Sequence, residues 1–97
     1  MSEFFDLSGR VALVTGASRG LGQYFGRALA RAGADLVISA RKLESLCEFQ
    51  KEIEGLGRSA KPVELDVRDY ASIQRMAEAA EQAYGKIDIL VNNAGIT

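Results

Sequence analysis

The sequence predicts an α/β fold in which parallel strands alternate with helices. From Arg10 onward, short apolar and β-branched runs alternate with longer stretches whose apolar residues recur every three or four positions. Three of the short runs, VALV, LVI and ILV, are apolar at consecutive positions, which is typical of parallel strands covered on both faces. With 97 residues, the chain has the size of one small domain without an internal boundary.

The first half of the chain supplies two strands and two helices. We expect strands over residues 11–15 and 35–39 and a helix that starts near Gly20 and ends at Gly33. A second helix should end before Gly57. The apolar stripe expected to face the sheet is formed in the first helix by Leu21, Phe25, Ala28, Leu29 and Ala32, and in the second by Leu43, Leu46, Ile53 and Leu56.

The second half supplies two more strands and one helix. Residues 60–65 form the third predicted strand, and Pro62 marks it as an outer one because proline cannot donate to a ladder. Asp69 can cap a third helix that ends at Gly85, and the last strand covers residues 87–91. The apolar stripe of this helix is Ile73, Met76, Ala77, Ala80 and Tyr84.

The resulting βαβαβαβ order, with right-handed crossovers and a reversal after the third strand, predicts the sheet order 3-2-1-4. This is the first half of a Rossmann-type three-layer sandwich and is incomplete. Helices one and two should share a face, and helix three should cover the other alone. Because the fourth strand is left as an unpaired apolar edge, we expect a homo-oligomer or association with a complementary fragment.

Composition excludes several classes of function. The net charge of −1 gives no basic field for nucleic acid. One cysteine and no histidine argue against an internal disulfide and against a metal site. The single cysteine also favours a reducing compartment, so we expect a cytoplasmic protein. Because the start MSEFFDLSGR carries acidic residues and no apolar run reaches membrane length, we expect no signal peptide and no membrane partner.

The loop TGASRGLG, residues 15–22, joins the first strand to the first helix and has two interpretations. It is either a plain strand-to-helix turn or a phosphate-binding loop at a helix N-terminus. In the second interpretation Gly16 permits the turn, Gly20 allows close backbone approach and Gly22 lets the helix pack on the sheet. A Walker loop is excluded because the required Lys is missing.

Three motifs stand in order at strand ends: T-G-x-x-x-G-x-G, then Asp66-Val67, then Asn92-Asn93-Ala94-Gly95. With them, the whole chain closely resembles the short-chain dehydrogenase/reductase family. The opening FFDLSGRVALVTGASRGLG is similar to gluconate 5-dehydrogenase-like and 3-oxoacyl-carrier-protein reductase-like members. The resemblance implies that the loop holds a dinucleotide pyrophosphate, that Asp66 binds the adenine amino group and that Asn93 lies near the adenosine ribose.

The candidate cofactor-binding residues are therefore Gly16, Ala17, Ser18, Arg19, Gly20, Leu21, Gly22, Arg41, Asp66, Val67, Asn93, Ala94 and Gly95. Structural alternatives remain for two of the motifs. Asp66 could only start the turn that leads to Asp69, and residues 92–95 could only end a strand.

The second strand indicates which dinucleotide is bound. NAD-preferring sites carry Asp or Glu about 20 residues past the loop, and Ala40 holds that place here. Arg41 and Lys42 follow at the expected start of the second helix, where the helix dipole disfavours cations unless an anion accompanies them. Arg19 can add a guanidinium fork from the loop. The prediction is NADP, and the alternative is that all three are solvated surface charges.

The reaction class follows from the resemblance, which implies hydride transfer between nicotinamide and a small carbonyl or alcohol substrate, with a Ser and a Tyr-x-x-x-Lys pair. No tyrosine here has its lysine: Tyr24, Tyr70 and Tyr84 are followed four residues later by Ala28, Gln74 and Asp88. We therefore expect residues 1–97 to be the N-terminal part of a single NADP-binding Rossmann domain, without catalytic residues. The parent protein would be an NADP-dependent oxidoreductase, and a non-catalytic NADP-binding module is the alternative.

Overall fold

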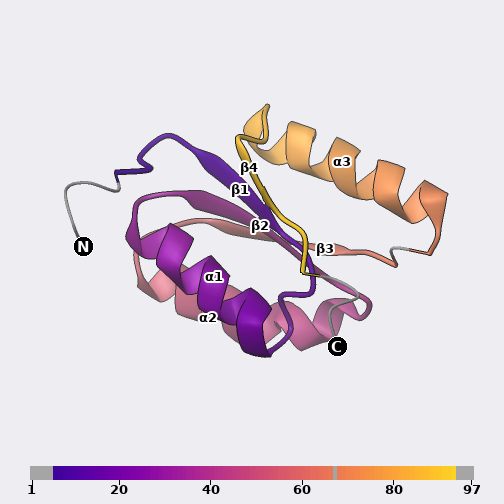
Figure 1. Ribbon diagram of the computed structural model, residues 1–97, viewed down its shortest axis with the longest axis horizontal. Helices are drawn as coiled ribbons and strands as arrows, with labels where there is room; N and C mark the ends of the chain where they lie inside the picture. Colours follow the sequence, from indigo (N-terminus) through magenta and orange to yellow (C-terminus); the bar gives the residue numbers. More distant parts are fainter. Residues whose placement is uncertain (1–5, 67, 94–97) are drawn as a thin grey trace.

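The computed structural model describes residues 6–66 and 68–93 and confirms the α/β fold (Figure 1). The site candidates Val67, Ala94 and Gly95 lie outside the described residues. In chain order the elements are β1 (Val11–Val14), α1 (Gly20–Arg31), β2 (Asp35–Ala40), the 3₁₀ turn η1 (Leu43–Leu46), α2 (Cys47–Gly55), β3 (Ala60–Glu64), α3 (Tyr70–Tyr84) and β4 (Ile89–Val91).

The strands form one parallel sheet in the order β3-β2-β1-β4, as predicted. In the register, Leu13 of β1 lies between Val37 of β2 and Leu90 of β4. The order reverses between β1 and β4. Their carboxyl ends therefore lie side by side, which is where a ligand crevice is expected in such sheets.

Helices cover the two faces of the sheet as the crossover rule predicted. In Figure 1, α1 and α2 lie on one side and α3 lies on the other. On the first side, Leu36 and Ile38 of β2 pack with Leu46, Phe49 and Ile53. On the second side, Val11, Leu13 and Val37 pack with Leu65 and with Met76 and Ala80 of α3. The longest described helix, α3, has 15 residues, and no described helix is long and apolar enough to cross a membrane.

The predicted buried stripe of α1 is wrong at two positions. Leu21 is 51% exposed and Ala28 is also exposed, whereas Gly22, Gly26 and Ala30 form the buried side. The reason is the short distance between the helix and its neighbours. A Cβ added at Gly26 would lie 2.7 Å from Cζ of Phe49, so only small residues fit on that side.

The second helical segment also departs from the prediction. It starts as the 3₁₀ turn η1, in which the Ser45 N–H donates to the Lys42 carbonyl at 3.1 Å, and the α-helix begins at Cys47. Of the predicted stripe, Leu46 and Ile53 are buried, but Leu43 and Leu56 are exposed. Phe49, which the prediction omitted, is almost fully buried and forms the centre of this side of the core.

The third helix begins and ends as predicted. The Asp69 carboxylate caps it by accepting from the Ala71 N–H at 3.0 Å, and Gly85 ends it with φ at +79°. The predicted inner residue Ala77 is exposed, and Ser72 is buried in the first turn instead. The strand bounds differ by one or two residues from the predictions, which is normal at element ends.

Candidate functional site

Thr15 connects the carboxyl ends of β1 and β4. Its backbone N–H donates to the Val91 carbonyl at 3.0 Å, and its hydroxyl lies 3.2 Å from Oδ1 of Asn92. The same hydroxyl accepts from the Asn93 N–H at 2.8 Å. The glycine loop and the chain after β4 are thus held against each other, as the strand order predicted.

The glycine loop packs against the first turn of α1. Gly16 has φ at +64°, and a Cβ added at Gly22 would lie only 2.2 Å from the Gly16 carbonyl oxygen. The Asn93 side-chain amide donates to that same oxygen at 3.3 Å. Gly20 has φ at +58°, and a Cβ there would meet no described atom within 4 Å. The packing predicted for Gly22 is therefore observed, and Gly20 borders open space.

The N-terminus of α1 has no side-chain cap within the described part of the chain. Its N-cap residue is Arg19, in extended conformation, and the first turn holds no acidic residue. Neighbouring loop groups are already paired: the Ala17 N–H donates to the Ser39 carbonyl at 2.8 Å, and Gln23 donates to the Ser18 carbonyl at 2.9 Å. The first amide groups of α1 and the positive end of its dipole suit an anion.

The end of β2 carries no acidic side chain. Ala40 is its last residue, is 7% exposed and accepts from the Leu65 N–H at 2.8 Å. Arg41 and Lys42 follow and are exposed. Lys42 is the N-cap of η1, and η1 continues directly into α2 at Cys47, so the two cations stand at the start of the helical segment as predicted, although its first turn is 3₁₀.

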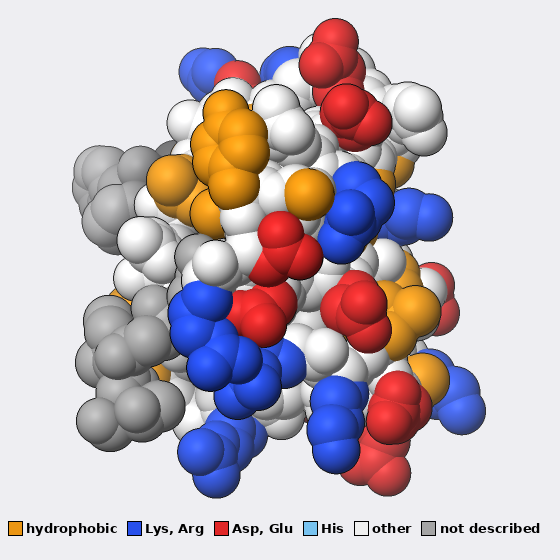
Figure 2. Space-filling model, turned by 90° about the vertical axis from the view of Figure 1, so that its right-hand side faces the viewer, with side chains coloured by type: hydrophobic (Ala, Val, Ile, Leu, Met, Phe, Trp, Pro, Cys, Tyr) orange, Lys and Arg blue, Asp and Glu red, His pale blue; other side chains and the backbone are white. Residues whose placement is uncertain are grey.

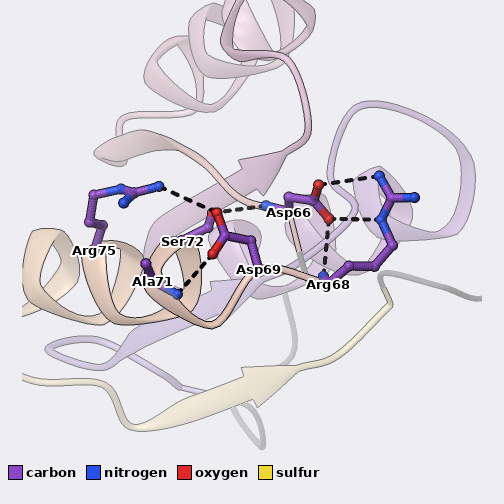
Figure 3. Close-up of polar contacts among 6 residues, drawn as sticks. All are labelled: Asp66, Arg68, Asp69, Ala71, Ser72 and Arg75. Carbon is purple, nitrogen blue, oxygen red and sulfur yellow. Dashed lines mark hydrogen bonds and ion pairs between the residues drawn. The ribbon is translucent and has the colours of Figure 1, made fainter.

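Asp66 lies just after β3, and its carboxylate is engaged by Arg68 (Figure 3). Oδ1 accepts from the Arg68 N–H at 3.0 Å and from Nε at 3.2 Å, and Oδ2 accepts from Nη2 at 3.2 Å. The Arg68 side chain, followed by its backbone N–H, lowers the pKa of Asp66, and the charge of Arg41 adds a smaller effect. The Asp66 side chain stays 37% exposed.

The turn that was the alternative interpretation of Asp66 is also present. The Asp66 carbonyl accepts from the Asp69 N–H at 3.0 Å, and its N–H donates to Oγ of Ser72 at 2.9 Å. These bonds use only backbone groups of Asp66. The carboxylate also takes part in the turn, because Oδ1 accepts from the Arg68 N–H. The described backbone N–H groups of the turn do not use Oδ2, so the turn and a ligand role for this oxygen are compatible.

Mixed charges surround this end of the molecule. Figure 2 views the side on which β3 ends and α3 begins, and there Lys and Arg side chains lie beside Asp and Glu side chains rather than in a uniform basic field. Among the described residues, no group of three His, Cys, Asp or Glu side chains could hold a metal ion.

Tyr84 lies far from this site. Its hydroxyl donates to the Leu36 carbonyl at 3.1 Å and lies 2.7 Å from Oγ of Ser59, at the amino ends of β2 and β3. Burial raises the pKa of Tyr84, and the nearby charge of Asp35 adds to this. Both the place and the direction of the shift are opposite to what a proton-exchanging tyrosine at the crevice requires.

Sequence reasoning missed three residues of the site. Thr15 was read only as part of the loop motif, although a hydroxyl between two strand ends was a usable signal. Arg68 was overlooked, although a cation two residues after Asp66 is within reach of its carboxylate. Ser72 gave no local signal, because its contact with Asp66 depends on how α3 is placed.

A model of the short chain dehydrogenase family matches residues 10–97. The chain belongs to this family. It is 46% identical over 94 residues to gluconate 5-dehydrogenase of Gluconobacter oxydans, covering 97% of this chain and 37% of that protein. It is 39% identical over 95 residues to the rhamnolipids biosynthesis 3-oxoacyl-[acyl-carrier-protein] reductase of Pseudomonas aeruginosa, covering 98% of this chain and 37% of that protein.

Among solved structures, the chain is similar to a metagenomic short-chain oxidoreductase in complex with NADP. The TM-score is 0.87 at 43% identity, covering 92% of this chain and 40% of that one. These matches confirm the family named from the three motifs. They also show that the chain spans 37% of the length of each of the two curated relatives above.

Proposed function

We propose that this chain binds NADP at the carboxyl ends of β1, β2 and β4, as the N-terminal part of one Rossmann domain that includes residues 1–97. The parent protein is then an NADP-dependent oxidoreductase acting on a small carbonyl or alcohol. When bound, the nicotinamide supplies or receives the hydride. The observation that carries the choice of NADP is that β2 ends at Ala40 and is followed by Arg41, where an NAD site would place an acid.

Three features of the described residues fit a dinucleotide. The uncapped N-terminus of α1 suits a pyrophosphate. Oδ1 of Asn93 is buried and has no hydrogen-bond partner in the described part of the chain, so it can accept from a ribose hydroxyl. The half-exposed Asp66 carboxylate can accept from an adenine amino group.

The choice of NADP over NAD rests on charge. A 2′-phosphate near the end of β2 would meet no carboxylate from Ala40 and would have Arg41 beside it. Arg19, at the N-cap of α1, can approach from the loop with a second guanidinium fork. Ala17, Ser18 and Leu21 complete the loop side of the proposed site. Val67, Ala94 and Gly95 belong to it on the family resemblance alone.

The described tyrosines take no part in the proposed hydride transfer. Tyr84 is bonded at the other end of the sheet, and Tyr24 and Tyr70 lack a lysine four residues later. On this proposal, the proton-exchanging groups of the oxidoreductase come from outside these 97 residues. The same observation favours a second candidate, a module that binds NADP without catalysis. Carbonyl-dependent NADPH oxidation by the parent protein supports the first candidate, and binding without turnover supports the second.

The proposed setting is cytoplasmic, with a second copy or a complementary fragment as partner.

Titration calorimetry of the protein that contains this chain tests the cofactor choice with NADP⁺ and NAD⁺. Charge-assisted bonds contribute about 1.5–3 kcal/mol each, so we expect NADP⁺ to bind at least about tenfold more tightly. Ala40→Asp should invert the preference, because its carboxylate repels the 2′-phosphate and can bind the ribose hydroxyls. In Ala40→Asn the new side chain has the size of aspartate without its charge, so this variant should keep the preference for NADP⁺. Equal affinities in the wild type, or inversion by both variants, would contradict the proposal.

A further inference from the structure

The Asp66 carboxylate has a countable number of acceptor positions. An ionised carboxylate can accept about four hydrogen bonds, two at each oxygen. Oδ1 already accepts two, from the backbone N–H and from Nε of Arg68, whereas Oδ2 accepts one, from Nη2. Within residues 6–66 and 68–93, one acceptor position, on Oδ2, is left.

We infer that Arg68 is a positioning residue for the adenine end of the dinucleotide, holding Asp66 so that Oδ2 presents one acceptor to an exocyclic amino group. The inference rests on the proposed function, because it places the adenine beside Asp66. It goes beyond that function in assigning a specificity role to a side chain that lies outside the three motifs. The 6-amino group of adenine is a donor, whereas hypoxanthine carries a carbonyl acceptor at the same position and would meet the unshared Oδ2 lone pair.

The ion pair between Asp66 and Arg68 is exposed, so we expect it to orient the carboxylate rather than to stabilise the fold. The side chains of Asp66 and Arg68 are 37% and 71% exposed, and surface ion pairs add little to folding. Two parallel N–H···O bonds from the guanidinium nevertheless fix the carboxylate plane. The backbone of Asp66 is fixed by Ser72 and Asp69, and Oδ1 accepts from the Arg68 backbone N–H, a bond that does not depend on the Arg68 side chain. The guanidinium therefore adds the second restraint, which fixes the carboxylate plane and the direction of Oδ2.

Arg75 of α3 offers a control. Arg75 forms an ion pair with Asp69, at 3.9 Å between Nη2 and Oδ2, and its side chain is 66% exposed. Figure 3 shows this pair on the opposite side of Asp66 from Arg68. Replacing Arg75 with Ala removes the same charge from a neighbouring ion pair without changing the contacts of Asp66.

The test measures, by calorimetry on the protein that contains this chain, the affinity ratio of NADP⁺ to its hypoxanthine analogue. In Arg68→Ala the carboxylate keeps only the bond from the backbone N–H to Oδ1, so its plane can rotate and must be ordered again on binding. We therefore expect Arg68→Ala to lower this ratio about three- to tenfold. Arg75→Ala should leave the ratio unchanged. Arg68→Lys keeps the charge but lacks the planar fork, and it should resemble Arg68→Ala. An unchanged or increased ratio in Arg68→Ala, or a wild-type ratio in Arg68→Lys, would overturn the inference.

Asp66→Asn separates this inference from the proposed function. If Asp66→Asn abolishes the preference for adenine but Arg68→Ala does not, the inference about Arg68 fails and the adenine placement stands. If Asp66→Asn leaves the ratio unchanged, or neither dinucleotide binds the wild type, the proposed site itself fails and the inference fails with it. Carboxyl NMR titration without ligand gives a second readout. The pKa of Asp66 should rise toward the ordinary value of 3.8 in Arg68→Ala and not in Arg75→Ala, and an unmoved pKa in Arg68→Ala would contradict the role of the ion pair.

Discussion

Helices cover the two faces of the sheet to very different extents. On the α1 and α2 face, Phe49, Leu46 and Ile53 are at most 1% exposed and cover β1 and β2. On the α3 face, Met76 and Ala80 supply the buried helix contacts, while Leu90 of β4 is 62% exposed. The difference shows that the described core is concentrated under the first two helices, and that β4 has little cover on the α3 side.

The position of α3 explains this difference. Its last residue, Tyr84, is tied by its hydroxyl to Leu36 and Ser59, which anchors the helix over β2 and β3. Leu90 is aligned with Leu13, so its side chain points to the same face as α3 but lies one strand beyond β1. A parallel strand with one bare apolar side is exceptional, because such sheets are normally covered on both faces.

The largest expected effect is the loss of Phe49. Removing a buried phenylalanine costs about 3–5 kcal/mol in free energy of unfolding, and Phe49 also packs beneath the Arg27 guanidinium, 5.6 Å from its ring centroid. Met76→Ala, on the open face, should cost about 2 kcal/mol because the site can relax more easily. Urea unfolding followed by circular dichroism measures both. A loss for Met76→Ala equal to or larger than that for Phe49→Ala would contradict the difference between the faces.

Gly26→Ala should have the next largest effect. The added Cβ would lie 2.7 Å from Cζ of Phe49, a ring that is too buried to move freely, so overpacking should cost about 1–3 kcal/mol. Gly55→Ala is the control, since a Cβ there meets nothing within 4 Å and Gly55 ends α2. It should stabilise the protein by about 0.4–1 kcal/mol. The same urea titration reports both variants, and destabilisation by both would refute the packing argument.

Asp88 links the amino ends of β1 and β4, because its carboxylate accepts from the Val11 N–H. This contact should make the stability of the fold depend on pH. The Val11 N–H, and then Lys86 and Arg10, lower the pKa of Asp88 below its ordinary value of 3.8. The folded form therefore binds its proton less readily than the unfolded form. Its stabilisation is complete above the unfolded pKa and is lost as pH falls through the folded value. Thermal melts from pH 6 down should show a shallower decline in Asp88→Asn than in the wild type. Parallel declines would exclude this role.

Leu90→Ser should have the smallest effect on stability and a clear effect on association. Surface substitutions usually change the free energy of unfolding by less than about 0.5 kcal/mol. We expect the 97-residue chain to self-associate through the bare side of β4, and Leu90→Ser to reduce the mass seen by light scattering. Leu56→Ser, at the 41% exposed leucine that follows α2, should not. A monodisperse wild-type monomer with a cooperative melt would refute this expectation.

The strand order and the faces of the helices were predictable because strands with consecutive apolar residues and right-handed crossovers allow few topologies. The buried side of α1 was not, because hydrophobic periodicity ranks Leu21 above Gly22 and Gly26. The closeness of α1 to Phe49 reverses that order, and Phe49 comes from another helix. Local patterns record the polarity of a side chain but not the distance to its neighbours.

The candidate site shows the same limit. The motif residues Gly16, Gly22 and Asn93 were found because backbone conformation and turn chemistry restrict residue type locally. Arg68 lies two residues after Asp66 and could have been indicated by that spacing, whereas Ser72 meets Asp66 only once β3 and α3 are placed. The 3₁₀ form of the turn after Lys42 was not predicted, because a single sequence does not distinguish a 3₁₀ turn from the first turn of an α-helix.

The contact between Gly22 and the Gly16 carbonyl also bears on how this protein can change over evolution. Since a single added carbon at Gly22 would lie 2.2 Å from that oxygen, the point where the glycine loop meets α1 can hardly tolerate substitution. Arg41 and Arg68, by contrast, are exposed and can be replaced without disturbing the core. Mutational tolerance is therefore low at Gly22, beside the loop that would hold the pyrophosphate common to all dinucleotides. It is high at Arg41 and Arg68, which would distinguish one dinucleotide from another, so a new cofactor preference can arise through few substitutions.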